Sequence, residues 1–312
     1  MTSAFIFPGQ GSQAVGMGKE LADAYPAAKA VFEAVDDALD QKLSSLMFEG
    51  PEDQLTLTEN AQPAIMAVSV AVLRVLESQG GLNLAAAASH VAGHSLGEYS
   101  AHAAAGTFSL ADTARLLKTR GQAMQQAVPV GEGAMAALLG LEPRDAEAVA
   151  LEAAGDQVCE FANDNADGQV VVSGSTAAVK RAVNIAKDMG AKRAMLLPVS
   201  APFHCALMLP AAKVMAGALA AVAMNDPMVP IVANVTAAPI QDVMEIRRLL
   251  VKQVTCRVRW RESVMAMKSA GVDRLVEIGY GKVLSGMTRR IDRDMSGVSV
   301  GSPEDVDTFL AG

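Results

Sequence analysis

Cysteine is scarce in this chain of 312 residues, and no hydrophobic run in it is very long. The three cysteines, Cys159, Cys205 and Cys256, are odd in number, lie far apart and match no metal-binding spacing. This pattern excludes a disulfide framework and predicts a reducing compartment, with no metal site and no redox role. No apolar run reaches the roughly 18 residues of a membrane span, and no basic leader opens the chain. We therefore expect a cytoplasmic protein that makes no membrane contact.

Basic residues are outnumbered by acidic ones, 26 against 34, and the resulting net charge of -8 argues against a general nucleic-acid-binding protein. The charge is unevenly spread, because residues 1–60 carry -7 and residues 251–293 carry +6. A basic face on an acidic protein favours an acidic partner or a phosphorylated ligand. A solvated surface with local ion pairs explains the same segment equally well.

Aromatic residues make up only 4% of the chain although 51% of it is hydrophobic. Alanine-rich and valine-rich segments alternate with glycine turns, which is typical of an α/β protein with closely packed helices. The length exceeds that of a usual single core, so we expect one large domain and a smaller one.

Short apolar runs predict the strands of the large domain at residues 4–7, 87–91, 229–233, 274–278 and 298–300. Helices are predicted at residues 61–79, with Pro63 in the first turn, and at residues 96–105 and 110–128. Between Pro129 and Pro198 the predicted order is strand, helix, strand, strand, helix, strand, which is a ferredoxin-like unit. Its elements are expected at residues 134–139, 143–154, 158–162, 169–173, 176–189 and 192–197.

The most informative residues are Gly93 to Gly97, with the sequence GHSLG, at the junction of a predicted strand and a predicted helix. A sharp strand-to-helix turn strains the residue between its glycines and lifts that side chain clear of the sheet. The hydroxyl of Ser95 would then lie at a helix N-terminus, where free N–H groups stabilise an oxyanion. We therefore predict an α/β-hydrolase-like large domain with a parallel sheet, formed by residues 1–128 and 198–312, and an inserted ferredoxin-like domain at residues 129–197.

A serine hydroxyl needs a base, and the chain offers only four histidines. His94 adjoins the serine, where neighbouring side chains diverge, whereas His204 lies in a loop beyond the predicted small domain. We favour His204 as the base. In an α/β-hydrolase the histidine lies near the C-terminus, but here more than a hundred residues follow it. That difference weakens the prediction of a hydrolase.

Seven motifs, in this order along nearly the whole chain, resemble those of the malonyl-CoA:acyl carrier protein transacylase family. They are FPGQGSQ at 7–13, ENAQPA at 59–64, GHSLGEY at 93–99, RGQAM at 120–124, NADGQVVVSG at 165–174, SAPFH at 200–204 and IGYGKVL at 278–284. The resemblance implies that Ser95 accepts the acyl group and that His204 is its general base and acid. It also implies that the main-chain carbonyl of Gln253 orients this histidine and that the N–H groups of Gln10 and Leu96 form the oxyanion hole.

The resemblance further implies that Arg120 holds the free carboxylate of the malonyl group, since a planar guanidinium can grip a carboxylate through two parallel hydrogen bonds. Gln62 and Asn165 match polar positions of the family's cleft. Phe203 resembles the residue of malonyl-preferring members, because a bulky ring leaves little room for a branched acyl group.

From the same resemblance we expect a two-step acyl exchange in fatty acid synthesis, with malonyl-CoA and acyl carrier protein as the partners, no metal or redox cofactor, and a monomer. Carrier proteins of this kind are acidic, so the basic segment 251–293 and the basic residues of the small domain are candidate docking surfaces. Two alternatives remain at this stage. One is a serine esterase or thioesterase, and the other is a catalytically silent carrier-binding module.

Overall fold

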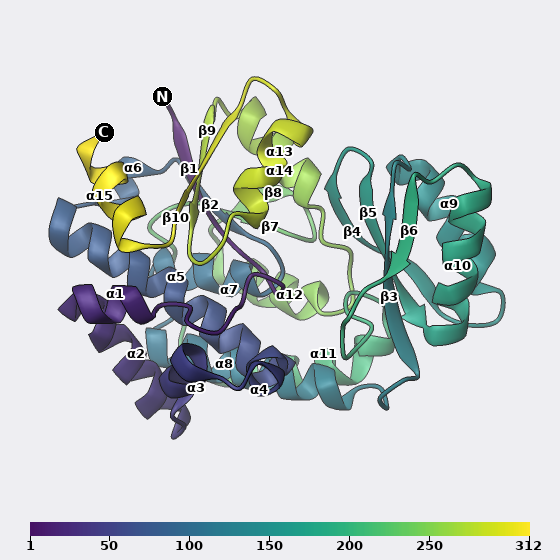
Figure 1. Ribbon diagram of the computed structural model, residues 1–312, viewed down its shortest axis with the longest axis horizontal. Coiled ribbons are helices and arrows are strands. Elements are labelled where there is room, and N and C mark those ends of the chain that lie inside the picture. Colours follow the sequence, from purple (N-terminus) through teal and green to yellow (C-terminus); the bar gives the residue numbers. More distant parts are fainter.

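Buried apolar runs form the strands of a six-stranded sheet in the computed structural model, which describes all residues 1–312 (Figure 1). The strand order is β10-β9-β1-β2-β7-β8, and every neighbouring pair is parallel except β7 and β8. The strands are β1 (Ser3–Phe7), β2 (His90–Gly93), β7 (Ile231–Ala233), β8 (Ala238–Ile240), β9 (Arg274–Ile278) and β10 (Ser296–Val300). The predicted α/β fold class with a parallel sheet is confirmed.

Strand β1 lies in the interior of this sheet, and both of its faces are buried. Successive side chains of a strand point to opposite faces, so Phe5 and Phe7 join the main hydrophobic core while Ala4 and Ile6 join a second one. Strand β1 pairs in register with β2 from Ala4 opposite His90 to Phe7 opposite Gly93. The loop that follows β1 therefore lies beside the turn that follows β2.

Helices cover both faces of the sheet (Figure 1). Helices α13 and α14 pack against the second core, whereas α2, α5, α7, α8 and α11 pack around the main one. The helices of this unit are α1 (Lys19–Ala24), α2 (Pro26–Leu39), α3 (Leu43–Glu49), α4 (Glu52–Thr56), α5 (Thr58–Gly80), α6 (Leu84–Ala87), α7 (Leu96–Ala104), α8 (Leu110–Gln126), α11 (Leu209–Ala221), α12 (Val243–Gln253), α13 (Trp260–Ser269), α14 (Val283–Ile291) and α15 (Pro303–Ala311), with a short 3₁₀ helix at Ala206–Met208.

Helix α5 is long and apolar enough to cross a membrane, but 83% of its apolar window is buried inside the protein, so it is a core helix. It begins at Thr58 and not at residue 61, because the N–H groups of Asn60 and Ala61 already bond the carbonyl of Leu57. The prediction that Pro63 lies in the first turn was therefore wrong, and Pro63 lies one turn further in.

Strand β2 is displaced from the predicted range 87–91. Residues Leu84–Ala87 form the short helix α6, in which the Asn83 side chain accepts a hydrogen bond from the N–H of Ala86. Alanine favours a helix once such a cap is present. The strand consequently begins at His90 and runs up to Gly93, so that the turn containing Ser95 follows it at once.

A separate four-stranded antiparallel sheet, on the right in Figure 1, has the order β4-β5-β3-β6. Its elements are β3 (Gly133–Leu139), α9 (Pro143–Ala154), β4 (Cys159–Ala166), β5 (Gln169–Ser175), α10 (Thr176–Asp188) and β6 (Arg193–Leu196). This is the element order of the predicted ferredoxin-like unit, and the unit has a hydrophobic core of its own. All six elements lie within the predicted range 129–197.

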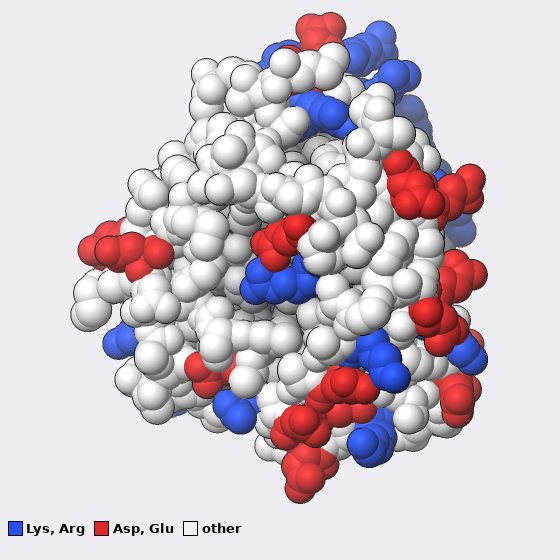
Figure 2. Space-filling view, turned by 90° about the vertical axis from the view of Figure 1, so that its left-hand side faces the viewer, with Lys and Arg blue, Asp and Glu red and all other residues white.

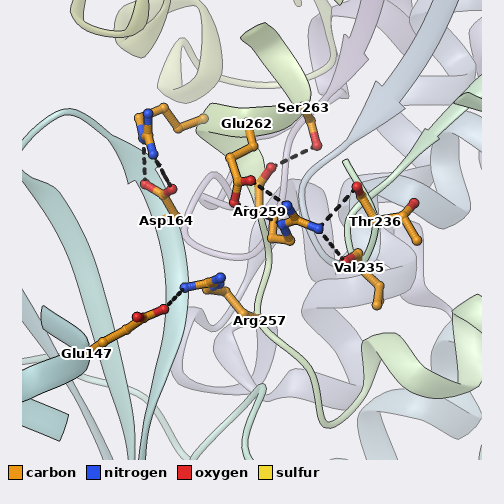
Figure 3. Close-up of polar contacts among 9 residues, drawn as sticks. Glu147, Asp164, Val235, Thr236, Arg257, Arg259, Glu262 and Ser263 are labelled. Carbon is orange, nitrogen blue, oxygen red and sulfur yellow. Dashed lines mark hydrogen bonds and ion pairs between the residues drawn. The ribbon is translucent and has the colours of Figure 1, made fainter. Parts of the chain in front are cut away.

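The two units are fastened together along β4 and the segment that precedes α13. The N–H of Val258 bonds the carbonyl of Ala162 at 2.9 Å, and the N–H of Asp164 bonds the carbonyl of Val258 at 3.0 Å. Arg257 pairs with Glu147 at 2.6 Å (Figure 3). Arg261 pairs with Asp164 at 3.0 Å. These contacts hold the small unit beside the carboxyl ends of the large sheet's strands.

The acidic segment 1–60 and the basic segment 251–293 do not form separate surfaces of one charge on the face that Figure 2 shows. Figure 2 shows the side of the molecule that lies on the left in Figure 1, where acidic and basic side chains are interspersed and no field of one sign covers the face. In the basic segment, four cations form ion pairs, namely Arg257, Arg259, Arg261 and Lys268. Local ion pairing therefore accounts for part of its +6 charge.

Candidate active site

Ser95 lies in a strained turn between β2 and α7. Its backbone has φ 54° and ψ -109°, a region that residues with a side chain rarely adopt. A Cβ atom on Gly93 would lie 1.9 Å from the carbonyl atoms of Gly97, and one on Gly97 would lie 2.2 Å from the carbonyl oxygen of Phe7. The close approach of these backbone segments requires glycine at both positions, as expected of a nucleophile elbow.

Two residues that line the same cavity as Ser95 have backbone N–H groups without a hydrogen-bond partner. The Leu96 N–H is at the first position of α7, and the Gln10 N–H belongs to the loop after β1; neither donates a hydrogen bond within the protein. Because β1 and β2 are adjacent and in register, both residues line one cavity with Ser95. Unpaired N–H groups at such a place stabilise a negative oxygen.

His204 lies against the serine although 109 residues separate the two in sequence. The Ser95 hydroxyl donates to Nε2 of His204 at 2.8 Å. The opposite nitrogen, Nδ1, faces two main-chain carbonyls, those of Gln253 at 2.9 Å and Cys256 at 3.2 Å. Since carbonyls only accept, Nδ1 carries the proton and Nε2 is left as an acceptor that faces the Ser95 hydroxyl.

Burial and the nearby charge of Arg120 lower the pKa of His204 to about 3. Both effects disfavour the imidazolium form. The imidazole is thus neutral near pH 7 and ready to accept the hydroxyl proton.

Arg120 projects from α8 into the same place and is only 1% exposed. Its Nη2 donates to the Ser95 Oγ at 3.1 Å and to the Gln253 Oε1 at 2.9 Å, while its Nη1 donates to the Gln62 Oε1 at 2.8 Å. Its charge lies 5.6 Å from the centre of the Tyr99 ring. The site therefore holds a buried cation at hydrogen-bond distance from the Ser95 hydroxyl.

A cavity of about 510 Å³ opens between the two units in front of these groups. Asn165 and Phe203 line it, and the Asn165 Oδ1 lies 2.8 Å from Nε2 of His94. His94 is held there by Asn165, away from the serine hydroxyl. All nine residues singled out from the sequence lie at this cavity or directly behind it: Gln10, Gln62, Ser95, Leu96, Arg120, Asn165, Phe203, His204 and Gln253.

Two residues that sequence reasoning missed support the turn from behind. Asn234, just after β7, accepts from the Ser95 N–H at 2.7 Å and donates to the Gly93 carbonyl at 2.6 Å. Glu98 in α7 is 1% exposed and accepts from the N–H of Asn234 at 3.0 Å. Burial raises the pKa of Glu98 to about 7, although hydrogen bonds from Asn234 and Gln253 and the charge of Arg120 act against the rise.

A sequence signal existed for only one of these two. Asn234 follows a predicted strand, and polar side chains at the carboxyl ends of parallel strands gather at one edge of the sheet. Glu98 gave no such signal, because a glutamate in a helix's first turn is ordinarily a solvated partner of the helix dipole.

Comparison with known proteins shows which family this chain belongs to. The model of the acyl transferase domain family matches residues 4–300. The chain belongs to this family of acyltransferases. Curated relatives of this acyltransferase include the malonyl CoA-acyl carrier protein transacylases of Bacillus subtilis, 45% identical over 98% of this chain and 96% of the relative, and of Escherichia coli K12, 45% identical over 96% of each.

Solved structures agree with this family assignment. An acyl-carrier-protein S-malonyltransferase from Bartonella henselae is 57% identical, with a TM-score of 0.97 over 100% of this chain and 99% of that one. A malonyl-transacylase solved in complex with a type II PKS acyl-carrier protein is 42% identical, with a TM-score of 0.96 over 100% of this chain and 99% of that one. The acyltransferase thus shares its complete fold with these two proteins. Their sequence identity to this chain, 57% and 42%, supports the same family assignment.

Proposed function

We infer that this acyltransferase moves a malonyl group from malonyl-CoA to the phosphopantetheine thiol of an acyl carrier protein. The observation that carries this inference is the buried guanidinium of Arg120 at 3.1 Å from the nucleophilic oxygen of Ser95. An acyl group on that oxygen meets a cation, which favours one that ends in a carboxylate. The printed names of the relatives describe the same transfer.

In the first half-reaction, the Ser95 Oγ attacks the thioester carbonyl of malonyl-CoA while Nε2 of His204 takes the hydroxyl proton. The N–H groups of Gln10 and Leu96 stabilise the oxygen that becomes negative. The carbon–sulfur bond then breaks, and His204 returns the proton to the CoA thiolate. A malonyl ester on Ser95 remains, and the carboxylate of this ester is bound by Arg120.

In the second half-reaction, the thiol of the carrier's phosphopantetheine arm gives its proton to His204 and attacks the serine ester. The ester's carbon–oxygen bond breaks, His204 protonates the Ser95 oxygen, and a malonyl thioester leaves on the carrier. Proton transfer and acyl transfer are thus complete with serine and histidine, so we propose a reaction that uses no metal or redox cofactor.

The carrier's docking surface is proposed to include the C-terminal end of α14. Arg289 and Arg290 in the last turn of this helix, and Arg293 just after it, are exposed and form no ion pair. An acidic carrier would find uncompensated positive charge there. By contrast, Arg181 of the small unit donates to the Ala153 and Ala154 carbonyls at the end of α9, and its guanidinium is thereby engaged within the protein.

We further propose that the enzyme supplies extender units for fatty acid synthesis in the cytoplasm and that it acts as a monomer. A monomer is supported by the site itself, because one chain contributes the nucleophile, the base, the oxyanion donors and the arginine.

The test is to trap the intermediate. Protein mixed with malonyl-CoA is expected to gain the mass of one malonyl ester on Ser95, and added holo-carrier should remove it as malonyl-carrier. Ser95→Ala should give no adduct. Ser100→Ala is the matched control, because this buried serine of α7, the helix that follows Ser95, has no hydrogen-bond partner. Release of free malonate in place of malonyl-carrier would indicate an esterase, and absence of any adduct would indicate a silent binding module.

A further inference from the structure

The side chain of Gln253 makes contacts that its main-chain carbonyl does not. The carbonyl accepts from Nδ1 of His204, but the side chain turns toward the arginine and is completely buried. Its Oε1 accepts from Nη2 of Arg120 at 2.9 Å. Its Nε2 donates to the main-chain carbonyl of Ser95 at 2.9 Å and to Oε2 of Glu98 at 2.8 Å. One residue thus contacts the base through its backbone and the cation through its side chain.

The neighbours of this amide allow only one orientation. If the amide were flipped, its oxygen would face two acceptors, the Ser95 carbonyl and the Glu98 carboxylate, and its N–H groups would face the N–H donors of Arg120. Buried polar groups without partners are costly, so the flipped form is excluded. Glu98 is itself fixed by the N–H of Asn234. Glu98 and the Ser95 carbonyl together therefore decide which end of the Gln253 amide meets the arginine.

The guanidinium is consequently held at both ends, with Nη1 on Gln62 and Nη2 on Gln253. An arginine side chain has many rotamers, and ordering it in one place costs conformational entropy unless neighbours fix it. The carboxylate of a malonyl group is separated from the acylated oxygen by only two carbon atoms. Only a guanidinium kept close to the Ser95 oxygen can bind it.

We propose that Gln253, through its side-chain amide, and Glu98, through Gln253, are positioning residues that hold Arg120 at the distance a malonyl group requires. They set the preference for malonyl over acetyl groups, because an acetyl group has no carboxylate for Arg120 to bind. This inference rests on the proposed function, and it assigns to the Gln253 side chain a role separate from that of its main-chain carbonyl.

The first test is Gln253→Met, which keeps the main-chain carbonyl and nearly the same side-chain volume. Loss of a hydrogen bond to a charged group predicts that the ratio of kcat/KM for malonyl-CoA to kcat/KM for acetyl-CoA falls by about 10- to 100-fold. Cleavage of the neutral ester p-nitrophenyl acetate checks that Ser95 and His204 still react. An equal loss with malonyl-CoA and acetyl-CoA, or no loss with malonyl-CoA, would overturn the proposal.

The second test uses Glu98, whose part is to accept hydrogen bonds. Glu98→Gln keeps an acceptor oxygen and should retain the malonyl-to-acetyl ratio within about threefold, whereas Glu98→Ala should lower it by about tenfold or more. Equal ratios for the two variants would contradict this role of Glu98. If Glu98→Ala does not fold, the malonyl-to-acetyl ratios of Gln253→Met and Glu98→Gln still test the proposal. Failure of the wild-type protein to transfer malonyl groups would refute the proposed function and is seen before any variant is compared.

Discussion

Removing the guanidinium of Arg120 tests the basis of malonyl recognition most directly. Arg120→Ala deletes the only cation within hydrogen-bond reach of Ser95, at a position that is 1% exposed. A malonyl carboxylate that enters this buried place without its partner loses about 2 to 5 kcal/mol of binding. At 1.4 kcal/mol for each tenfold change, this loss corresponds to a fall of about 30-fold to about 4000-fold in kcat/KM for malonyl-CoA.

The acetyl group gives the internal reference for this variant. It carries no charge, so it gains nothing from Arg120 and should be transferred as well by the variant as by the wild type, or better. The assay is single-turnover acylation followed by intact mass, with malonyl-CoA and acetyl-CoA side by side. Arg115→Ala is the matched control, because Arg115 lies on the same helix but is exposed and pairs with Asp112.

Folding must be measured on the same samples. Arg120→Ala leaves the side-chain oxygens of Gln62 and Gln253 without a donor, and each buried acceptor left unpaired costs about 1 to 3 kcal/mol of stability. A lower Tm is therefore expected. If the folded variant lost malonyl and acetyl transfer equally, Arg120 would be structural and the reasoning on the carboxylate would be refuted.

Three further outcomes are expected. His204→Ala should slow acylation by about 100- to 10,000-fold, because both the activation of Ser95 and the protonation of the leaving thiolate fail; near-normal turnover would assign the base elsewhere. The lowered pKa of His204 keeps the imidazole neutral below pH 6.5, so cleavage of p-nitrophenyl acetate should persist at pH 5.5, and an acid limb centred at pH 6.5 would contradict the assigned cause. Charge reversal at Arg289 and Arg290 should raise the KM for the carrier, flatten its salt dependence and spare acylation by malonyl-CoA, with exposed Lys19→Glu as the control. Unchanged carrier kinetics would place docking away from α14.

Local features of the site were accessible from the sequence because each depends on residues close together in the chain. The glycines at 93 and 97 predict a sharp turn at Ser95 whatever the rest of the fold does, and the turn is present. The alternation of strands and helices between Pro129 and Pro198 predicts the small unit for the same reason. An error arose at Ala87, which was predicted to begin the strand 87–91 but ends the helical turn that Asn83 caps.

The contacts between distant segments were decided only by the tertiary structure. The sequence indicates that His204 is a candidate base, but the packing of its loop against the end of α12 determines that Nδ1 faces two carbonyls and that Nε2 faces Ser95. In the same way, Arg257 is one basic residue among ten in its segment until the fold places Glu147 beside it. Neighbours in sequence set a local conformation, whereas the meeting of side chains far apart depends on strand order and packing. The chemistry-bearing residues of this acyltransferase could therefore be named from the sequence, but the distances and hydrogen bonds through which they act could not.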